Sequence, residues 1–299
     1  MSTPGRDRPV AAIDVGTNTA LLLIAGGSPE SPTPLLERAT ITRLGKGVDR
    51  TGRLDGAALD RTIECLAGYG DELRARGVTH AAAVCTSAAR DAENGAELVA
   101  RAEAALGCAV RVIGGEEEAA LTFEGALTGL GVDGAVTVFD VGGGSTEIIH
   151  GTASAGAEGS RRLPGASVSL DVGSVRLTER HLSSDPPTAA ELAATTAAAR
   201  TALAGATPRP GTLVGVAGTV TTLAALHLGL VPYDGARVHG ARLSLLDVER
   251  WSARLGSLAV AERARLPGLD PKRADVIVAG ALLVAELLRW SGREELIAS

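Results

Sequence analysis

An aspartate followed by a glycine turn is the first feature of this sequence that could do chemistry. Asp14 ends an apolar stretch and is followed by Gly16, Thr17 and Asn18. Glycine lets backbone N–H groups approach an anion without a Cβ in the way, and the hydroxyl and amide side chains add donors. A carboxylate at a strand end offers Mg²⁺ a hard oxygen ligand. The turn therefore predicts binding of phosphate together with a divalent cation.

The same pattern returns later in the chain. Asp140 again ends an apolar stretch, 126 residues after Asp14, and precedes a run of glycine and hydroxyl residues. A third glycine motif lies where another apolar stretch leads into a predicted helix. A single glycine turn is usually only a hairpin, but three such junctions in one chain favour a phosphate-binding role. The residues concerned in the second and third motifs are Gly142, Gly143, Gly144, Ser145, Gly218 and Thr219.

Three consecutive glutamates, Glu116, Glu117 and Glu118, open a predicted helix directly after Gly115. Acidic residues at a helix start interact favourably with the helix dipole, and that role alone accounts for Glu116. Neighbouring residues point about 100° apart around a helix, so only one of Glu117 and Glu118 can face a site squarely. A carboxylate beside bound phosphate could act as a general base toward water.

Two further features have two readings each. The charged stretch 43–53 is either a solvated loop face or a groove for a polyanion; its basic residues are Arg43, Lys46, Arg50 and Arg53. His239 could contact a substrate, but its neighbours Val238 and Gly240 equally suit a packed turn.

The elements that must position these residues alternate between strands and helices. Strands are predicted at 10–14, 19–24, 81–85, 109–113, 135–139, 145–149 and 213–216, and helices at 56–76, 94–106, 116–130, from 187 to 203, from 220 and at 273–290. Loops are expected at 26–34 and 151–160 because both are rich in Gly, Ser or Ala without apolar periodicity. The long separation of the two aspartate motifs predicts two related α/β domains, residues 1–125 and 126–299, rather than a solenoid.

Composition limits the class of protein. The chain has 299 residues, 45% of them hydrophobic and only 2% aromatic, so it can bury a large core built from small aliphatic side chains. Its net charge of −6 and its lack of a long Lys/Arg run argue against nucleic acid as a partner. The polar N-terminus and the absence of a long apolar segment predict a cytoplasmic protein without membrane contact. Three cysteines without CxxC spacing favour free thiols.

Taken together, the motifs resemble those of the exopolyphosphatase and guanosine pentaphosphate phosphohydrolase (Ppx/GppA) family in its short, two-domain form. The resemblance runs from Ala11 to about Leu283, and it includes the sequences that begin at Ala12, Thr86, Gly115, Asp140, Gly215 and Val238. It implies an α/β, two-lobed, duplicated ribonuclease H-like fold, shared with sugar kinases, chaperone ATPases and actin, with the active site in the cleft between the lobes. By this resemblance the chain is expected to be a short form without the added helical domain of longer members.

The resemblance also implies roles for single residues. Glu118, or its neighbour Glu117, would be the catalytic base, and Arg90 would bind substrate phosphate beside the glycine turns. Asp140 and Glu147, with Asp14 assisting, would hold Mg²⁺, with Mn²⁺ as an alternative ion.

Several functions remain open at this point. The leading hypothesis is hydrolysis of inorganic polyphosphate, and its nearest rival is hydrolysis of guanosine pentaphosphate. The sequence shows no aromatic residue clearly placed to stack on a base, which favours polyphosphate. An ATP-dependent kinase and a non-catalytic phosphate or alarmone sensor are the alternatives from other classes, and a homodimer is compatible with the sequence but not determined by it.

Overall fold

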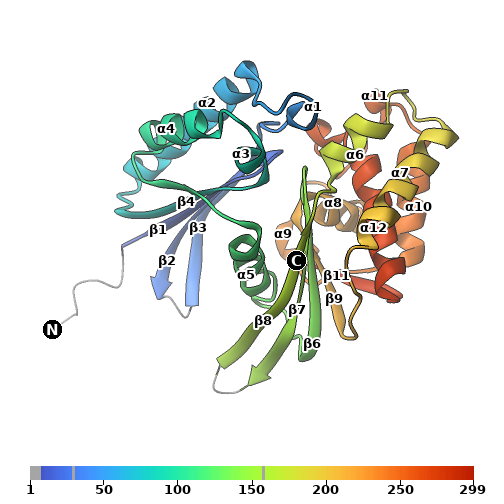
Figure 1. Ribbon diagram of the computed structural model, residues 1–299. Helices are drawn as coiled ribbons and strands as arrows, with labels where there is room; N and C mark the ends of the chain where they lie inside the picture. The colour runs from blue at the N-terminus through green and yellow to red at the C-terminus, as the bar shows by residue number, and fades with distance from the viewer. Residues whose placement is uncertain (1–7, 29–30, 157–158) are drawn as a thin grey trace. The chain divides into compact units, whose positions relative to one another are not determined.

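The computed structural model describes residues 8–28, 31–156 and 159–299 (Figure 1). The chain forms two compact units that divide between Gly114 and Gly115. Each unit is an α/β body with its own sheet and its own core.

The first unit is built on a five-stranded sheet of order β3-β2-β1-β4-β5. β1 pairs antiparallel with β2 and parallel with β4, and β3 and β5 form the two edges. The strands are β1 (Val10–Val15), β2 (Thr19–Ser28), β3 (Ser31–Ile41), β4 (His80–Cys85) and β5 (Val110–Val112).

Helices cover one face of this sheet. Alternate strand residues such as Ile13 and Leu22 point toward Leu59 and Leu66 and are buried with them, which is the period-2 pattern of a sheet covered on one face. The Asp55 side chain caps the longest helix by accepting a hydrogen bond from the Ala58 amide at 3.0 Å. The helices are α1 (Val48–Thr51), α2 (Gly56–Ala75), α3 (Ser87–Asp91) and α4 (Gly95–Leu106).

The second unit carries a six-stranded sheet of order β10-β11-β9-β6-β7-β8. β6 pairs antiparallel with β7 and parallel with β9, and β7 pairs antiparallel with β8. The strands are β6 (Gly134–Val141), β7 (Thr146–Gly156), β8 (Gly159–Leu170), β9 (Thr212–Val216), β10 (Arg242–Ser244) and β11 (Glu295–Ala298).

The two sheets share one topology. On one side of the central strand, successive strands pair antiparallel: β1-β2-β3 in the first sheet and β6-β7-β8 in the second. On the other side, strands that come later in the chain pair parallel: β1-β4-β5 and β6-β9-β11. β10 is the only strand of the second sheet with no counterpart in the first among the described residues. The two related domains predicted from the repeated aspartate motif are thus present as two copies of one sheet topology.

Helices cover both faces of the second sheet. α5 (Gly115–Ala126) packs on one face, where Ala119 and Phe123 contact a cluster that includes Val138 and Ile149. The other helices gather on the opposite face around the larger core (Figure 1). They are α6 (Ser174–His181), α7 (Ala189–Leu203), α8 (Ala217–Leu228), α9 (Gly235–Val238), α10 (Leu245–Gly256), α11 (Val260–Arg263), the 3₁₀ helix η1 (Pro271–Arg273) and α12 (Ile277–Ser291).

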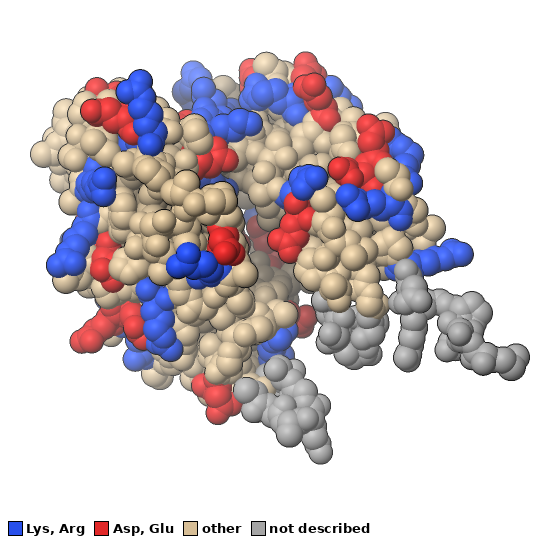
Figure 2. All heavy atoms as spheres, turned by 180° about the vertical axis from the view of Figure 1, so that it is seen from behind, with Lys and Arg blue, Asp and Glu red and all other residues tan. Residues whose placement is uncertain are grey.

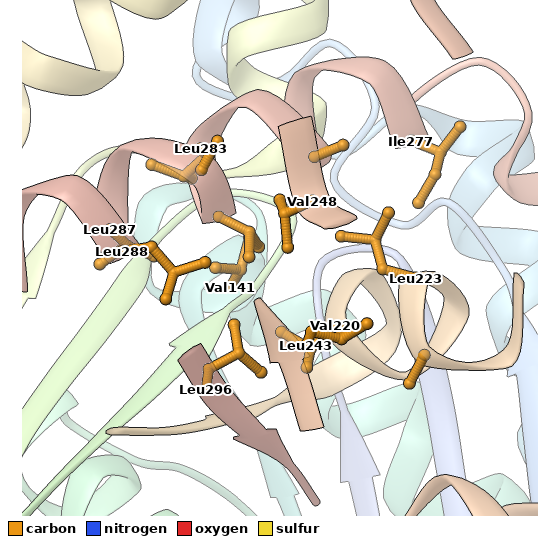
Figure 3. Packing of buried hydrophobic residues seen from close by; sticks show 14 of the residues in the cluster. Val141, Val220, Leu223, Leu243, Val248, Ile277, Leu283, Leu287, Leu288 and Leu296 are labelled. Carbon is orange, nitrogen blue, oxygen red and sulfur yellow. The ribbon is translucent and has the colours of Figure 1, made fainter. Parts of the chain in front are cut away.

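Aliphatic side chains make most of this larger core, with Phe139 buried among them. Val141 of β6 meets Val220 and Leu223 of α8, and Leu283 and Leu287 of α12 pack beside them (Figure 3). Small aliphatic side chains can fill such a space closely with few aromatic rings, as the composition predicted.

The structure corrects several boundaries expected from the sequence. The described parts of stretches 26–34 and 151–160 are not loops: β2 and β3 form one long hairpin, and β7 and β8 form another, while residues 29–30 and 157–158 lie outside the described residues. Both hairpins end in edge strands, which tolerate Gly and Pro. The helix expected at 116–130 ends at Ala126, and the sequence did not predict α6.

The helix expected from residue 187 begins at Ala189. Thr188 is the N-cap, and its hydroxyl and the Glu191 carboxylate form a reciprocal capping box.

α5 belongs with the second unit by its packing, whereas the domain boundary expected after residue 125 would place it with the first. In the described ranges no helix combines the length and apolar character needed to cross a membrane. Cys65, Cys85 and Cys108 are free thiols, as predicted.

Candidate functional site

The first glycine turn joins β1 to β2 in the first unit. The Gly16 amide donates to the Thr19 carbonyl at 3.0 Å, and a Cβ on Gly16 would lie 3.2 Å from that oxygen. Asp14, one residue before the strand end, is half-buried. It is close enough to Cys85 that its charge adds to burial in raising the pKa of that thiol to about 12.

The loop after β3 binds the carbonyl side of this turn. The amides of Thr42 and Arg43 both donate to the Asn18 carbonyl at 3.0 Å, and the Gly45 amide donates to the Thr17 carbonyl at 2.8 Å. A Cβ on Gly45 would lie 2.4 Å from Thr17 Cγ2, so this close approach requires glycine. The basic stretch 43–53 is therefore anchored beside the first turn.

Arg90 lies on α3, which begins at the end of β4. The Thr86 amide donates to the Val15 carbonyl at 3.3 Å, which ties the start of α3 to the first turn. Arg90 is half-buried and donates from Nη1 to the Ile113 carbonyl at 2.9 Å. Another of the basic residues, Arg53, forms an exposed ion pair with Glu93 at 3.1 Å.

The second glycine turn joins β6 to β7 and repeats the first. The Gly142 amide donates to the Ser145 carbonyl at 3.0 Å, and a Cβ on Gly142 would lie 3.1 Å from that oxygen. Gly143, Gly144 and Ser145 are buried. The two turns therefore have the same closing hydrogen bond and the same steric requirement for glycine.

A row of polar side chains crosses the second sheet beside this turn. Asp140 of β6 is in register with Glu147 of β7, and Glu147 is in register with Ser169 of β8. Residues opposite one another in an antiparallel pair share a face, so the two carboxylates lie on one side of the sheet. Glu147 is only 2% exposed, and its Oε1 accepts a hydrogen bond from Ser169 Oγ at 2.8 Å.

The glutamate helix begins at the end of this row. A Cβ on Gly115 would lie 3.2 Å from the Cβ of Ser169, so the first residue of α5 is packed against β8. Ala119 is buried on the sheet-facing side of α5. Glu118 is half-buried next to that side, whereas Glu116 and Glu117 are exposed.

The third glycine motif lies between β9 and α8 and is covered by its own chain. A Cβ on Gly218 would lie 1.8 Å from Nη1 of Arg273, so the guanidinium rests directly on the glycine. Thr219 is buried against Gly280 of α12. Ala217 has a positive φ of 70°, a strained conformation for a residue with a Cβ and one that concentrates at functional sites.

Burial lowers the pKa of Arg273, while Asp270 and Tyr233 act electrostatically to raise it. Tyr233 is 54% exposed. Tyr233 is thus within electrostatic range of Arg273 at the third motif, although the two residues are 40 positions apart and nothing local in the sequence links them.

The second unit contains a pair of carboxylates that could serve as ligands of a magnesium ion. No group of three or more His, Cys, Asp or Glu side chains in the described ranges is arranged to hold a metal on its own. Mg²⁺, however, is often held by one or two carboxylates with phosphate oxygens and waters completing its shell. The carboxylates of Asp140 and Glu147 supply such a pair, and Asp14 belongs to the other unit.

Other features lie away from these turns or pack within the protein. A hollow of about 310 Å³ lies near the N-terminal ends of β9 and β11, and Arg242 and Arg293 are among the residues that line it. None of the predicted site residues lines this hollow. His239 Nδ1 lies 3.3 Å from Ser299 Oγ, and the ring also limits the space at Gly129. These contacts match the packed-turn reading of His239.

Within each unit the structure brings together most of the predicted residues. The sequence reasoning missed Gly45, Ser169, Gly173, Arg176, Tyr233 and Arg273. Ser169 could have been found by aligning β8 with β7, but the others become visible only through tertiary contacts.

The comparison with protein-family models decides the family. The model of the Ppx/GppA phosphatase family matches residues 23–299. The chain belongs to this family. Exopolyphosphatase 2 of Mycobacterium tuberculosis is 41% identical over 295 residues, covering 94% of this chain and 90% of that protein.

Solved Ppx/GppA structures share the fold over nearly the full length. The Aquifex aeolicus family member superposes with a TM-score of 0.80 at 34% identity, covering 97% of this chain and 93% of that one. An exopolyphosphatase-like protein superposes with a TM-score of 0.89 at 32% identity, covering 97% and 94%. These matches and the repeated sheet topology confirm the predicted α/β fold with two related units, as found in solved Ppx/GppA structures.

Proposed function

We propose that this protein is an exopolyphosphatase, which hydrolyses the terminal phosphoanhydride of inorganic polyphosphate and releases orthophosphate. Membership of the Ppx/GppA phosphatase family and the 41% identity to Exopolyphosphatase 2 support this proposal. The observation that carries it is the second unit's combination of a glycine turn, two register-paired carboxylates and the half-buried Glu118. That set contains the groups that phosphoryl transfer to water needs.

The glycine turns would bind phosphate oxygens through backbone amides. Because most of phosphoryl transfer catalysis is positioning and electrostatic stabilisation, donors fixed by the fold are worth more than mobile ones. The residues proposed for phosphate binding are Asp14, Gly16, Thr17, Asn18 and Arg90 in the first unit, and Gly142, Gly143, Gly144, Ser145, Gly218 and Thr219 in the second.

Glu118 is the proposed general base. Its half-buried position beside the sheet-facing side of α5 supports it over the exposed Glu117. The carboxylate accepts a proton from water as the water oxygen bonds to the terminal phosphorus. The bond from that phosphorus to the bridging oxygen breaks, and the shortened chain leaves with the bridging oxygen.

Phosphatases of this family generally depend on a divalent metal, and we infer that Mg²⁺ serves here, with Mn²⁺ as a substitute. Asp140 and Glu147 would hold the ion, with Asp14 as a further ligand. When bound, the ion would neutralise charge on the phosphate oxygens. Ser169 holds Glu147 in place through its 2.8 Å hydrogen bond.

A phosphate-release assay tests the proposal directly. The protein is incubated with polyphosphate, guanosine pentaphosphate or ATP, each with and without Mg²⁺. We expect orthophosphate from polyphosphate only when Mg²⁺ is present. Binding of polyphosphate without release would favour a sensor, and transfer of the ATP phosphate to an acceptor would favour a kinase.

Hydrolysis of guanosine pentaphosphate is a second candidate, and one observation favours it. Arg273 rests on Gly218 of the third glycine motif and lies within electrostatic range of Tyr233, and both side-chain types can stack on a planar base. The test is competition. If Tyr233→Ala and Arg273→Ala reduce kcat/KM for guanosine pentaphosphate and leave that for polyphosphate unchanged, the nucleotide is a substrate in its own right.

A further inference from the structure

The first turn of α6 holds three consecutive carbonyls of the second glycine turn. The Ser174 amide donates to the Gly142 carbonyl at 2.9 Å, and the amides of Val175 and Arg176 donate to the Gly143 carbonyl at 2.9 and 3.1 Å. The third carbonyl, that of Gly144, accepts from Nε of Arg176 at 2.7 Å. Backbone amides therefore hold the first two carbonyls, with the Ser174 hydroxyl as a second donor to the Gly142 carbonyl at 3.2 Å, and the Arg176 side chain holds the last.

This contact fixes the direction of the amides in the turn. In a planar trans peptide, the C=O of one residue and the N–H of the next point in opposite directions. Since the carbonyls of residues 142–144 point toward α6, the N–H groups of residues 143–145 point away from it. Successive N–H groups on one side of a turn make an anion-binding concavity.

The close approach of α6 depends on a glycine. A Cβ on Gly173 would lie 2.5 Å from the Gly143 carbonyl oxygen and 2.8 Å from the Gly144 nitrogen. The first unit has the same arrangement, because the loop after β3 holds the Thr17 and Asn18 carbonyls. There the donors to these two carbonyls are the backbone amides of Thr42, Arg43 and Gly45.

We propose that Arg176 is a positioning residue for the phosphate cradle, and this inference rests on the proposed function. The peptide between Gly144 and Ser145 follows two glycines, whose backbone rotates more freely than that of other residues. The Arg176 guanidinium holds its carbonyl toward α6 and so keeps the Ser145 amide directed at the substrate phosphate. Without that hydrogen bond the peptide can rotate and the amide is no longer preorganised.

The experiment compares Arg176→Ala and Arg176→Lys with the parent and with Arg180→Ala. Arg180 is exposed and lies one turn further along the same helix, so its variant controls for loss of a positive charge on α6. We measure kcat and KM on polyphosphate, affinity for orthophosphate, and hydrogen exchange of the Ser145 amide. The Arg176→Ala assays are repeated with added guanidinium at millimolar concentration.

For Arg176→Ala we expect kcat/KM to fall about 10- to 100-fold, the range for losing one charge-assisted hydrogen bond. Orthophosphate affinity should fall as well, and the Ser145 amide should exchange faster. Arg176→Lys and added guanidinium should each restore part of the loss, because either supplies a cationic donor to the Gly144 carbonyl. Arg180→Ala should match the parent in all three measurements.

Three outcomes would overturn the proposal: parental kcat/KM in Arg176→Ala, an equal loss in Arg180→Ala, or a loss accompanied by unchanged Ser145 exchange. Failure of the proposed function gives a different result. In that case the parent releases no orthophosphate from polyphosphate, while orthophosphate affinity and Ser145 exchange still report whether Arg176 orients the turn.

Discussion

At the scale of single residues, Glu118 differs from the two glutamates before it by its burial. Glu116 and Glu117 are exposed at the start of α5, where the helix dipole stabilises any carboxylate. Glu118 is half-buried, on the helix whose first residue packs against Ser169. The difference in exposure follows from helix phase, since Gly115 and Ala119 must face the strands.

We expect Glu118→Gln to reduce turnover by about 10² to 10⁴ while phosphate binding is kept, because the amide preserves shape but cannot accept the proton. The measurement is kcat on polyphosphate together with orthophosphate affinity. Glu116→Gln is the matched control and should be nearly silent. Full activity in Glu118→Gln would move the base to another residue.

The pairing of Asp140 with Glu147 gives a second prediction at this scale. Asp140→Asn should raise the Mg²⁺ concentration needed for half activity, because an amide is a weaker ligand than a carboxylate for a hard cation. A Mg²⁺ titration of activity measures this shift. An unchanged titration curve would assign the metal to other acids, with Glu147 and Asp14 tested next.

At the scale of elements, β7 and α12 meet at a buried histidine. His150 of β7 is 8% exposed, stacks on Trp290 of α12 with ring centroids 6.4 Å apart, and lies 2.8 Å from the Thr137 hydroxyl through Nδ1. Burial, with a smaller contribution from Arg209, lowers its pKa below the ordinary 6.5. The folded state therefore binds a proton at this ring less readily than the unfolded state does.

The free energy of unfolding should therefore decrease as the pH falls below about 6.5, because the unfolded chain takes up the proton at a higher pH than the folded protein does. Above that pH both states carry a neutral ring and the contribution is constant. Urea unfolding between pH 5 and 8 measures the effect. The pH dependence in this range should be smaller in His150→Gln and unchanged in His80→Gln, since His80 is exposed; equal slopes in all three proteins would contradict the assignment.

At the scale of the whole molecule, the protein carries a net negative charge, and its basic and acidic side chains are interspersed rather than separated into large patches on the face shown in Figure 2. The net charge is −6. A long polyanion gains little from such a surface, because its phosphates meet repulsion wherever no basic loop or glycine turn binds them. The basic stretch 43–53, anchored beside the first turn, is the part of the first unit best suited to attract it.

We therefore expect kcat/KM to level off or decline beyond short polyphosphate chains, and salt to weaken this preference because it screens repulsion beyond about 8 Å at 0.15 M. The measurement is a chain-length series at two ionic strengths. Arg50→Ala, at an exposed position, should lower kcat/KM more at low salt than at high salt. A steady rise of kcat/KM with length that does not depend on Arg50 would mean that the substrate does not use this stretch.

The sequence by itself determined the class of fold and the motifs. Two aspartate-glycine turns at the ends of apolar stretches, 126 residues apart, predicted two related α/β units. These are local patterns, and local physics is enough to predict them. The boundaries in the Gly- and Ser-rich hairpins were not predictable in this way, because edge strands tolerate residues that otherwise mark loops.

Only the tertiary structure decided which residues support the turns. Gly173 and Arg176 come some 30 residues after the turn they hold, and no periodicity links them to it. The burial that separates Glu118 from Glu116 and Glu117 likewise depends on how α5 packs on β8. Contacts between distant segments are set by the packing of the whole unit, so they leave no local signature in the sequence.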